Sequence, residues 1–142
     1  MTDSDTLARL VDLEEIRDLA RRYAHSVWTQ NVDGAVGLFC EDGFMDVGDA
    51  EPVKGREKLR RAYENMIGDA DLQPFVHNHV IDLDGDHATG TCYLDLRATV
   101  DGRSMIGSGY YSDVYQRTGE GWRFKSRKLT LKFFVPLELG WA

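Results

Sequence analysis

Two histidines, His77 and His79, are the side chains in this sequence best suited to transfer a proton near neutral pH. They lie two positions apart in an extended run, so the pair is predicted to share one strand face with Phe75, Ile81 and Leu83. Three interpretations are open: a catalytic base, a half-buried structural or subunit-interface pair, or part of a metal site. The pattern favours the structural pair, because the neighbours are aliphatic and no third metal ligand is evident.

One cation, Arg127, lies in line with apolar residues in the last predicted strand. It is predicted to share a face with Leu129, Leu131 and Phe133. An arginine in this position is either at the rim of the sheet, with its guanidinium in water, or directed into a cavity, where it would bind an oxygen atom of a ligand. The sequence leaves both possibilities open.

A long amphipathic helix opens the chain and would form one wall of such a cavity. Apolar residues recur at helical spacings of three and four, which predicts one buried face and a start near residue 4 or 5. A short helix from Asp33 and a third helix from about Gly55 to Gly68 follow, separated by a short strand at 44–47. The buried face of the first helix is predicted to contain Ile16, Leu19, Ala20, Tyr23 and Val27.

Everything after Pro74 is predicted to be extended. Four runs, 75–83, 88–100, 104–117 and 122–135, are separated by short glycine-containing turns, which force antiparallel hairpins. Helices first and strands afterwards is an α+β order. The simplest packing lays the long helix across the concave side of a strongly curved sheet, which leaves a pocket in a cone with one open end.

Length and charge exclude several classes of protein. The 142 residues contain no linker or repeat, so one domain, 1–142, is expected. With 24 acidic against 17 basic side chains, the net charge is −7, which disfavours binding to nucleic acid or to an anionic membrane surface. No apolar run is long enough to span a bilayer, and no signal peptide precedes Cys40 and Cys92, so a cytoplasmic protein with reduced thiols is expected.

Several segments together resemble a known family. They are the segment from Tyr23 through Phe39 into LFCEDG, the KGRE start of the third helix, the strand pair HNHVIDLDGDHATGTCYL and the final hairpin GYYSDVYQR…GWRFKSR. In this order they resemble the SnoaL-like branch of the nuclear transport factor 2-like superfamily over nearly the whole chain. The resemblance implies an α+β cone: a strongly curved antiparallel sheet, wrapped around a long N-terminal helix and two shorter helices, that encloses a pocket. The branch includes hexachlorocyclohexane dehydrochlorinase, scytalone dehydratase and a bile-acid dehydratase, which are lyases without a cofactor.

The resemblance assigns roles to individual positions. In these lyases a histidine takes a proton from carbon and an aspartate orients it, but this sequence has Pro74 at the histidine position and Trp28 at the aspartate position. Tyr23 matches a tyrosine that lines the pocket, and Arg127 matches an arginine near the leaving group. With the usual dyad replaced, His77 is the candidate base, acting with Tyr23 and Arg127. The residues expected to bind the substrate are Val27, Trp28, Phe44, His79, Leu129 and Leu131.

The expected function is that of a cofactor-independent, dehydratase-like lyase or isomerase acting on a small hydrophobic, ring-containing molecule with a polar oxygen. The resemblance implies no metal or other cofactor. A non-catalytic binding protein of the same fold and a scaffold subunit that pairs its sheet with another chain are the alternatives. Self-association to a dimer or trimer is expected through the convex face of the sheet, on which Trp122, Phe124 or their neighbours are predicted to lie.

Overall fold

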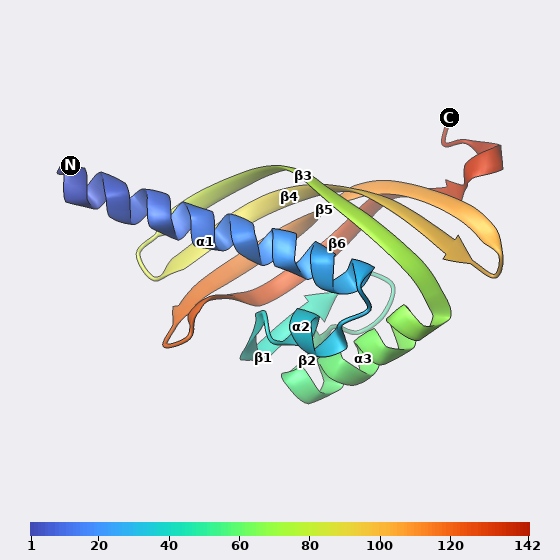
Figure 1. The fold of residues 1–142 in the computed structure, drawn as a ribbon, viewed down its shortest axis with the longest axis horizontal. Coiled ribbons are helices and arrows are strands. Elements are labelled where there is room, and N and C mark those ends of the chain that lie inside the picture. Colours follow the sequence, from blue (N-terminus) through green and yellow to red (C-terminus); the bar gives the residue numbers. More distant parts are fainter.

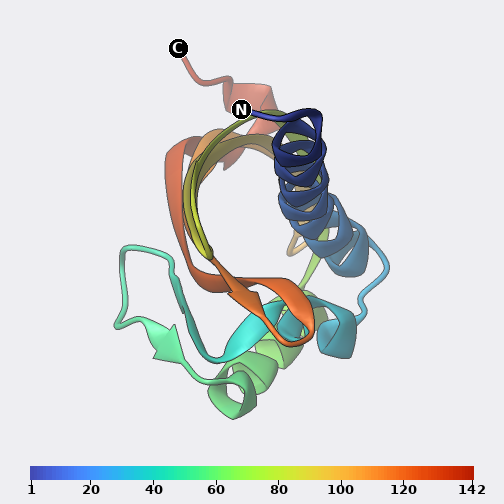
Figure 2. The ribbon, with the colours of Figure 1, turned by 90° about the vertical axis from the view of Figure 1, so that its left-hand side faces the viewer.

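A curved sheet is the centre of the architecture, and the long helix α1 (Asp3–Trp28) lies across its concave face (Figure 1, Figure 2). The computed structural model describes residues 1–142, apart from the side chain of Asp69. The other elements are α2 (Val32–Val36), β1 (Phe39–Asp46), β2 (Val53–Lys54), α3 (Arg56–Asp69), β3 (Ala70–Asp84), β4 (His87–Val100), β5 (Arg103–Thr118), β6 (Gly121–Pro136) and a final 3₁₀ turn (Leu137–Leu139). The strands are hydrogen-bonded in the order β2-β1-β6-β5-β4-β3. This is the predicted α+β cone.

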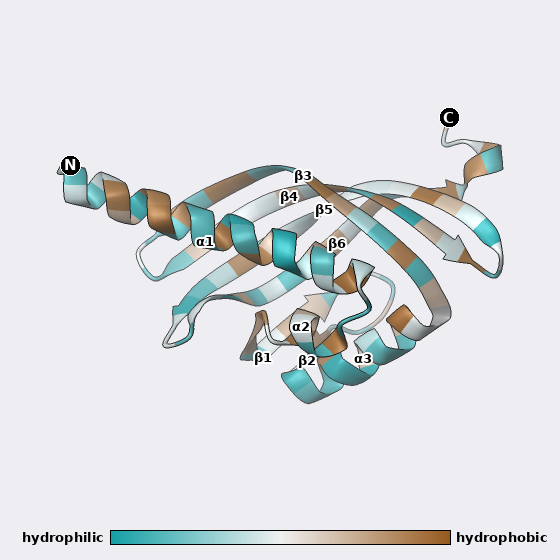
Figure 3. Ribbon diagram, in the orientation of Figure 1, coloured by the Kyte–Doolittle hydropathy of each residue, from teal (hydrophilic) through white to brown (hydrophobic). Residues whose placement is uncertain are grey.

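The helix α1 begins at a capping box. The hydroxyl of Thr2 accepts a hydrogen bond from the backbone N–H of Asp5 (3.1 Å), and the carboxylate of Asp5 accepts one from the backbone N–H of Thr2 (3.0 Å). Leu7, Leu10 and Val11 are exposed on the first turns, which project beyond the strands (Figure 3). The buried residues of the helix therefore all lie in its C-terminal half, from Ile16 onward. None of the described helices is both long and apolar enough to cross a membrane.

The sheet is mixed and not wholly antiparallel. The strands β3 to β6 form the three predicted antiparallel hairpins, but β1 runs parallel to β6, with Met45 opposite Arg127. A tight hairpin forces antiparallel pairing, whereas β1 and β6 are separated by α3 and four strands, and so long a connection permits either direction. The strand β1 is also longer than predicted, because α2 ends at Val36 and Phe39 already belongs to β1.

A β-bulge in β3 changes which of its side chains face the core. Val76 and His79 pair with Leu94 and Cys92, so β3 has one more residue than β4 between these two pairs. The extra residue reverses the alternation, and Val76 and His79 both face α1 while His77 lies on the convex face. The prediction that His77 and His79 share a face is therefore wrong, because strict alternation ends at the bulge.

A second bulge lies between β5 and β6. Leu131 pairs with Gly109 but Phe133 pairs with Ser108, which leaves one residue of β6 unpaired. Leu131 and Phe133 therefore lie on opposite faces, and the prediction that they share a face is wrong. Gly109 is required at this position, because a Cβ on it would lie 2.1 Å from the carbonyl oxygen of Thr130.

Aromatic residues fill the core between α1 and the concave face. Trp122 and Phe124 belong to this core, with 1% and 0% of their surface exposed, so their predicted position on the convex face is wrong. The reason is that α1 extends over this end of β6, where the indole N–H of Trp122 donates to the carboxylate of Asp12 (3.0 Å). The buried aromatic side chains are Tyr23, Phe39, Tyr63, Tyr111, Tyr115, Trp122 and Phe124.

Candidate active site

A fully buried ion pair joins the two strands of the last hairpin. Nε and Nη2 of Arg127 donate to the two carboxylate oxygens of Asp113 at 2.8 and 3.0 Å, and neither side chain has exposed surface. The rings of Tyr111, Phe124 and Tyr23 surround the guanidinium, with centroids 3.6, 4.3 and 4.5 Å from its central carbon. Arg127 is therefore neither at the rim of the sheet nor in the lining of the cavities described below. It holds Asp113 in the core as a carboxylate.

Asp113 is also the first link of a hydrogen-bonded relay that leads out of the core. The hydroxyl of Tyr115 donates to Oδ2 of Asp113 (2.9 Å), and Nε2 of His79 lies 2.7 Å from the same hydroxyl. Because Tyr115 uses its single proton toward Asp113, Nε2 of His79 must be the donor in the second contact. Nδ1 of the neutral imidazole then has a free lone pair and can accept a proton.

The surroundings of His79 keep its imidazole neutral. Burial lowers the pKa of His79 to about 4; Asp113 opposes this shift, and the charges of Arg127, Arg17 and Arg21 add to it. Burial also raises the pKa of Tyr115 above its ordinary value, so the hydroxyl keeps its proton and remains a donor to Asp113. At pH 7 the relay therefore ends in an unprotonated Nδ1.

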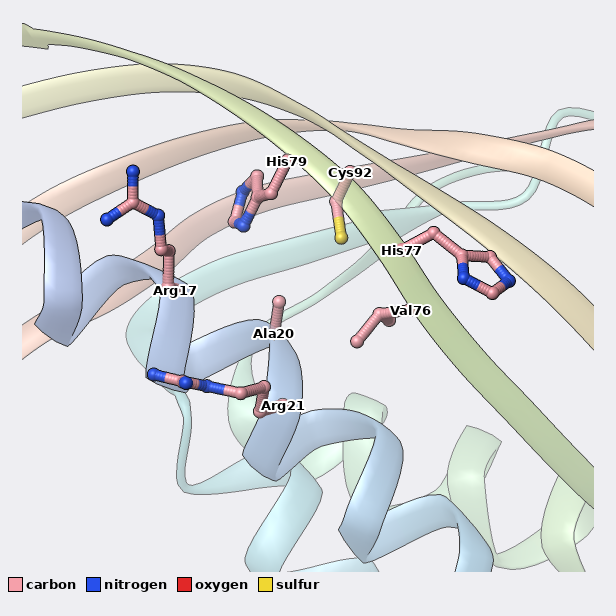
Figure 4. Close-up of a pocket in the computed structure, with 7 residues that line it drawn as sticks. All are labelled: Arg17, Ala20, Arg21, Val76, His77, His79 and Cys92. Atoms are coloured by element: carbon pink, nitrogen blue, oxygen red, sulfur yellow. The ribbon is translucent and has the colours of Figure 1, made fainter.

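His79 opens into a cavity of about 260 Å³ between α1 and β3, which we call the α1–β3 pocket (Figure 4). Figure 4 shows the side chains of Arg17 and His79 extending into the same space. Among the described side chains, carboxylates are absent from this lining, which combines two cations, two histidines and small apolar groups. The residues around the pocket are Arg17, Ala20, Arg21, Val76, His77, His79 and Cys92.

The predicted base His77 borders the pocket but is not joined to this relay. Its imidazole turns away from α1 in Figure 4, and its Nε2 lies 3.0 Å from a carboxylate oxygen of Asp95, with both side chains 51% exposed. The bulge in β3 accounts for this position, because it places His77 and His79 on opposite faces. Among the described side chains, no three His, Cys, Asp or Glu residues form a group that could hold a metal ion.

Tyr23 and Arg127 lie next to each other in the closed core. The hydroxyls of Tyr23 and Tyr63 are 2.6 Å apart, and burial raises the pKa of both residues above their ordinary values. At the end of α1, the indole N–H of Trp28 donates to the carbonyl oxygen of Pro74 (2.7 Å). This hydrogen bond joins the C-terminal end of α1 to β3.

A second cavity of about 270 Å³ lies between α3 and the β1–β2 pair, and we call it the α3–β1 cleft. Its lining is apolar apart from the tyrosine, which is the same Tyr63 that bonds to Tyr23. Such a lining binds by excluding water from apolar surface, and none of its described side chains titrates near neutral pH. The cleft is formed by Met45, Val47, Val53, Leu59, Ala62, Tyr63 and Met66.

The side chains predicted to line one pocket are distributed over several places. Val27 lies on the buried face of α1, and Leu129 packs against the core. Phe44 alternates with Met45 along β1, so it lies on the opposite face from the α3–β1 cleft. Leu131 is 36% exposed. Of the predicted substrate-binding residues, only His79 lies in the α1–β3 pocket.

The sequence analysis did not include Asp113, Arg17 or Arg21 among the candidate residues, and Tyr115 was interpreted chiefly as sheet packing. One signal for Asp113 was available, because it is an acidic residue between Tyr111 and Tyr115 on the buried alternation of β5. Its partner was harder to find. Counting back from the turn places Asp113 opposite Ser126, and the bulge between Val114 and Tyr115 shifts it to Arg127.

Solved structures of similar fold cover nearly the whole chain. A single-residue variant of Rv3472, a protein of unknown function from Mycobacterium tuberculosis, has a TM-score of 0.82 at 26% identity over 93% of this chain and 77% of its own. An NTF2-like protein with a cystatin-like fold from Novosphingobium aromaticivorans has a TM-score of 0.76 at 25% identity, over 91% and 87%. A hexachlorocyclohexane dehydrochlorinase, LinA type 2, has a TM-score of 0.83 at 17% identity, over 95% and 93%.

No functionally curated protein matches the sequence. The family model of the SnoaL-like domain matches residues 8–128, which include α1, the relay and Arg127. Together with the NTF2-like neighbours, this match confirms the resemblance found in the sequence. The chain belongs to the SnoaL-like domain family, within the NTF2-like superfamily.

Proposed function

We propose that the protein is a cofactor-independent lyase or isomerase that removes a proton from carbon in a small ring-containing molecule, with His79 as the base. The observation that carries the proposal is the relay from Asp113 through Tyr115 to His79, which leaves Nδ1 unprotonated beside a cavity. Family membership and the fold shared with a dehydrochlorinase support the reaction class by analogy.

In the proposed reaction, Nδ1 of His79 takes a proton from a carbon atom of the substrate. The electron pair of the broken C–H bond forms a C=C bond while a leaving group departs with its own pair, or the pair is held as an enolate that is reprotonated at another position. The new imidazolium keeps its Nε2–H contact with Tyr115, and the charge of Asp113 lies behind that hydroxyl. Asp113 and Tyr115 together thus take the part that a single aspartate plays beside a catalytic histidine.

Arg127 and Tyr23 act as positioning residues in this proposal. Arg127 fixes both oxygens of Asp113, and Tyr23 packs against the guanidinium from α1. Neither side chain contacts the α1–β3 pocket, whose lining contains His79 alone among the relay residues. The catalytic role first expected for Arg127 and Tyr23 is therefore replaced by one exerted through Asp113.

Deuterium exchange tests the proposal without knowledge of the leaving group. Ring ketones and ring β-keto acids are incubated with the protein in D₂O, and ¹H NMR follows the loss of signal at the carbon next to the carbonyl group. His79→Gln should lower the exchange rate at least about 100-fold, because general-base catalysis contributes this much. Tyr115→Phe should lower it about 10-fold, since the imidazolium loses its acceptor.

His87→Gln is the matched control, because His87 is exposed at the start of β4 and should exchange at the wild-type rate. An equal loss in His77→Gln and none in His79→Gln would restore His77 as the base. Absence of exchange across the panel with wild-type protein would reject the enzymatic proposal.

The apolar lining of the α3–β1 cleft favours a second candidate function, the non-catalytic binding of a small hydrophobic molecule. Titration with 2-naphthol, followed by its fluorescence, tests this function separately. Saturable binding by wild-type and His79→Gln proteins alike, without deuterium exchange in either, would make binding the function of the chain.

We also propose that the protein self-associates through exposed apolar surface. Phe75, Tyr93 and Tyr110 are between 36% and 40% exposed on the convex face. Size-exclusion chromatography with light scattering should give the mass of a dimer or trimer, and Tyr93→Lys should shift it toward the monomer. A monomeric wild-type protein at micromolar concentration would contradict this expectation.

A further inference from the structure

We propose that the α1–β3 pocket is built for a small ring-containing carboxylic acid, with Arg17 as the side chain that binds its carboxylate. This rests on the proposed function only in taking the bound acid as the substrate of His79, since anion binding by Arg17 does not itself require catalysis.

The first argument is the ion-pairing of the arginines on α1. Arg21 contacts Glu14 and Asp18, and Arg22 contacts Asp18 at 2.6 Å. Arg17, one turn before Arg21 on the same helix, forms no ion pair among the side chains that the structure describes, although it lines the pocket. A guanidinium without a carboxylate partner beside a cavity is a suitable partner for an anionic ligand.

The second argument is the contrast between the pocket and the rest of the molecule. The chain as a whole has a net charge of −7. The described lining of the pocket nevertheless contains Arg17, which has no ion-pair partner among the described side chains, and Arg21, with no aspartate or glutamate. A cation-rich cavity in an acidic protein attracts small anions while the remaining surface repels them.

The third argument concerns orientation. His79 lines the pocket, and its Nδ1 is an acceptor because Nε2 carries the proton, so a carboxylate oxygen placed against Nδ1 would face another acceptor. The carboxylate is therefore directed to Arg17, and an apolar part of the ligand lies toward His79. Ala20, Val76 and Cys92 supply the apolar wall against which a ring can pack.

Binding of the acid would also strengthen the base. Arg17 and Arg21 are among the charges that hold the imidazole of His79 neutral, and a carboxylate on Arg17 offsets part of their repulsion of the imidazolium. A bound carboxylic acid thus makes the imidazole of His79 a stronger base toward a C–H bond of the same ligand. A neutral ring compound would leave that repulsion in place.

Isothermal titration at low salt with benzoate, and with benzamide as its neutral isostere, tests the site. Wild-type protein should bind benzoate and not benzamide. Arg17→Gln should weaken benzoate binding about tenfold or more, because it removes a charge-assisted contact. Arg22→Gln, which removes the same charge from the same helix outside the pocket lining, should bind within about twofold of wild type, and Arg17→Lys should recover part of the affinity.

Equal binding of benzoate and benzamide, or equal losses in Arg17→Gln and Arg22→Gln, would overturn the proposal. The proposal would also be overturned if inorganic phosphate displaced benzoate completely and bound as tightly, because the ring of benzoate would then add nothing to its affinity. His79→Gln separates the two proposals. Benzoate binding that depends on Arg17 without deuterium exchange in any acid would reject only the lyase, whereas His79-dependent exchange of neutral ketones unaffected by Arg17→Gln would reject only the acid site.

Discussion

The α1–β3 pocket and the α3–β1 cleft have nearly the same volume, about 260 and 270 Å³, but opposite linings. The pocket contains two arginines and two histidines, whereas Tyr63 provides the only polar side chain among the described residues that line the cleft. Binding in the pocket must depend on charge and hydrogen bonds, and binding in the cleft on excluded water. The candidate proton acceptor, His79, therefore lies in a different cavity from the most apolar lining.

The two cavities are nevertheless joined through the core. Tyr63 lines the cleft and bonds to Tyr23, whose ring lies against Arg127. Arg127 binds Asp113, and Asp113 leads through Tyr115 to the pocket. A change in the buried ion pair should therefore disturb the pocket directly and the cleft only through packing. The predictions below start from that pair.

Asp113→Asn should have the largest effect, a loss of about 3 to 5 kcal/mol in the free energy of unfolding. The substitution leaves the guanidinium of Arg127 buried without a counter-charge and weakens the acceptor of Tyr115. Urea unfolding at pH 7 measures this loss of unfolding free energy. Glu57→Gln is the control, because Glu57 and Arg61 form an exposed pair and its loss should cost less than about 0.5 kcal/mol. Similarly small losses of unfolding free energy in both variants would mean that the ion pair of Asp113 and Arg127 does not hold the relay in place.

The pH dependence of stability should distinguish His79 from other histidines. Its pKa is about 4 in the folded protein against an ordinary 6.5, so the unfolded chain binds a proton first as the pH falls. Stability is therefore lost between pH 6.5 and 4 and is unaffected by this group above that window. The neighbouring charges are Arg17, Arg21, Asp113 and Arg127.

Urea unfolding of wild type and His79→Gln at several pH values between 7.5 and 4.5 measures this contribution. The free-energy difference between the two proteins should be constant above about pH 7. It should move in favour of the variant by about 1 to 2 kcal/mol at the acid end, a value reduced for solvent screening because His79 is only half-buried. If the free energies of unfolding of the two proteins changed in parallel with pH, the imidazole of His79 would not be desolvated, and the pocket would be open to solvent.

Ala62→Phe should change the free energy of unfolding by no more than about 1 to 2 kcal/mol, because the new ring occupies the α3–β1 cleft. It should abolish the binding of 2-naphthol and leave the affinity of the α1–β3 pocket for benzoate within about twofold. Asn65→Phe, on the exposed side of α3, controls for the added ring. Loss of both ligands in Ala62→Phe alone would show that the two cavities act as one site.

The sequence predicts this fold well because its signals are periodic. Helical spacing identifies α1 and α3, and short turns force the hairpins from β3 to β6. The resemblance rests on segments in the same order along nearly the whole chain, and the family match over residues 8–128 confirms it. Each of these inferences depends only on local pattern or on aligned segments.

The candidate site was predicted poorly because it depends on register. A bulge reverses the alternation of side chains, so the faces of His77 and His79 could not be read by counting along β3. The pairing of Asp113 with Arg127 could not be predicted for the same reason, since the bulge between Val114 and Tyr115 lies between that pair and the turn. Bulges arise from pairing between strands, and a single strand carries no periodic signal for them.

The bulge between Val76 and His79 has an evolutionary consequence. Removing one residue there, a change of a single codon, would restore strict alternation and exchange every side chain on one half of β3 between the interior and the exterior. A strand with such an irregularity can therefore move an imidazole from one face to the other without a new fold and without a new histidine. In this chain a proton acceptor can be relocated by insertion or deletion as well as by substitution.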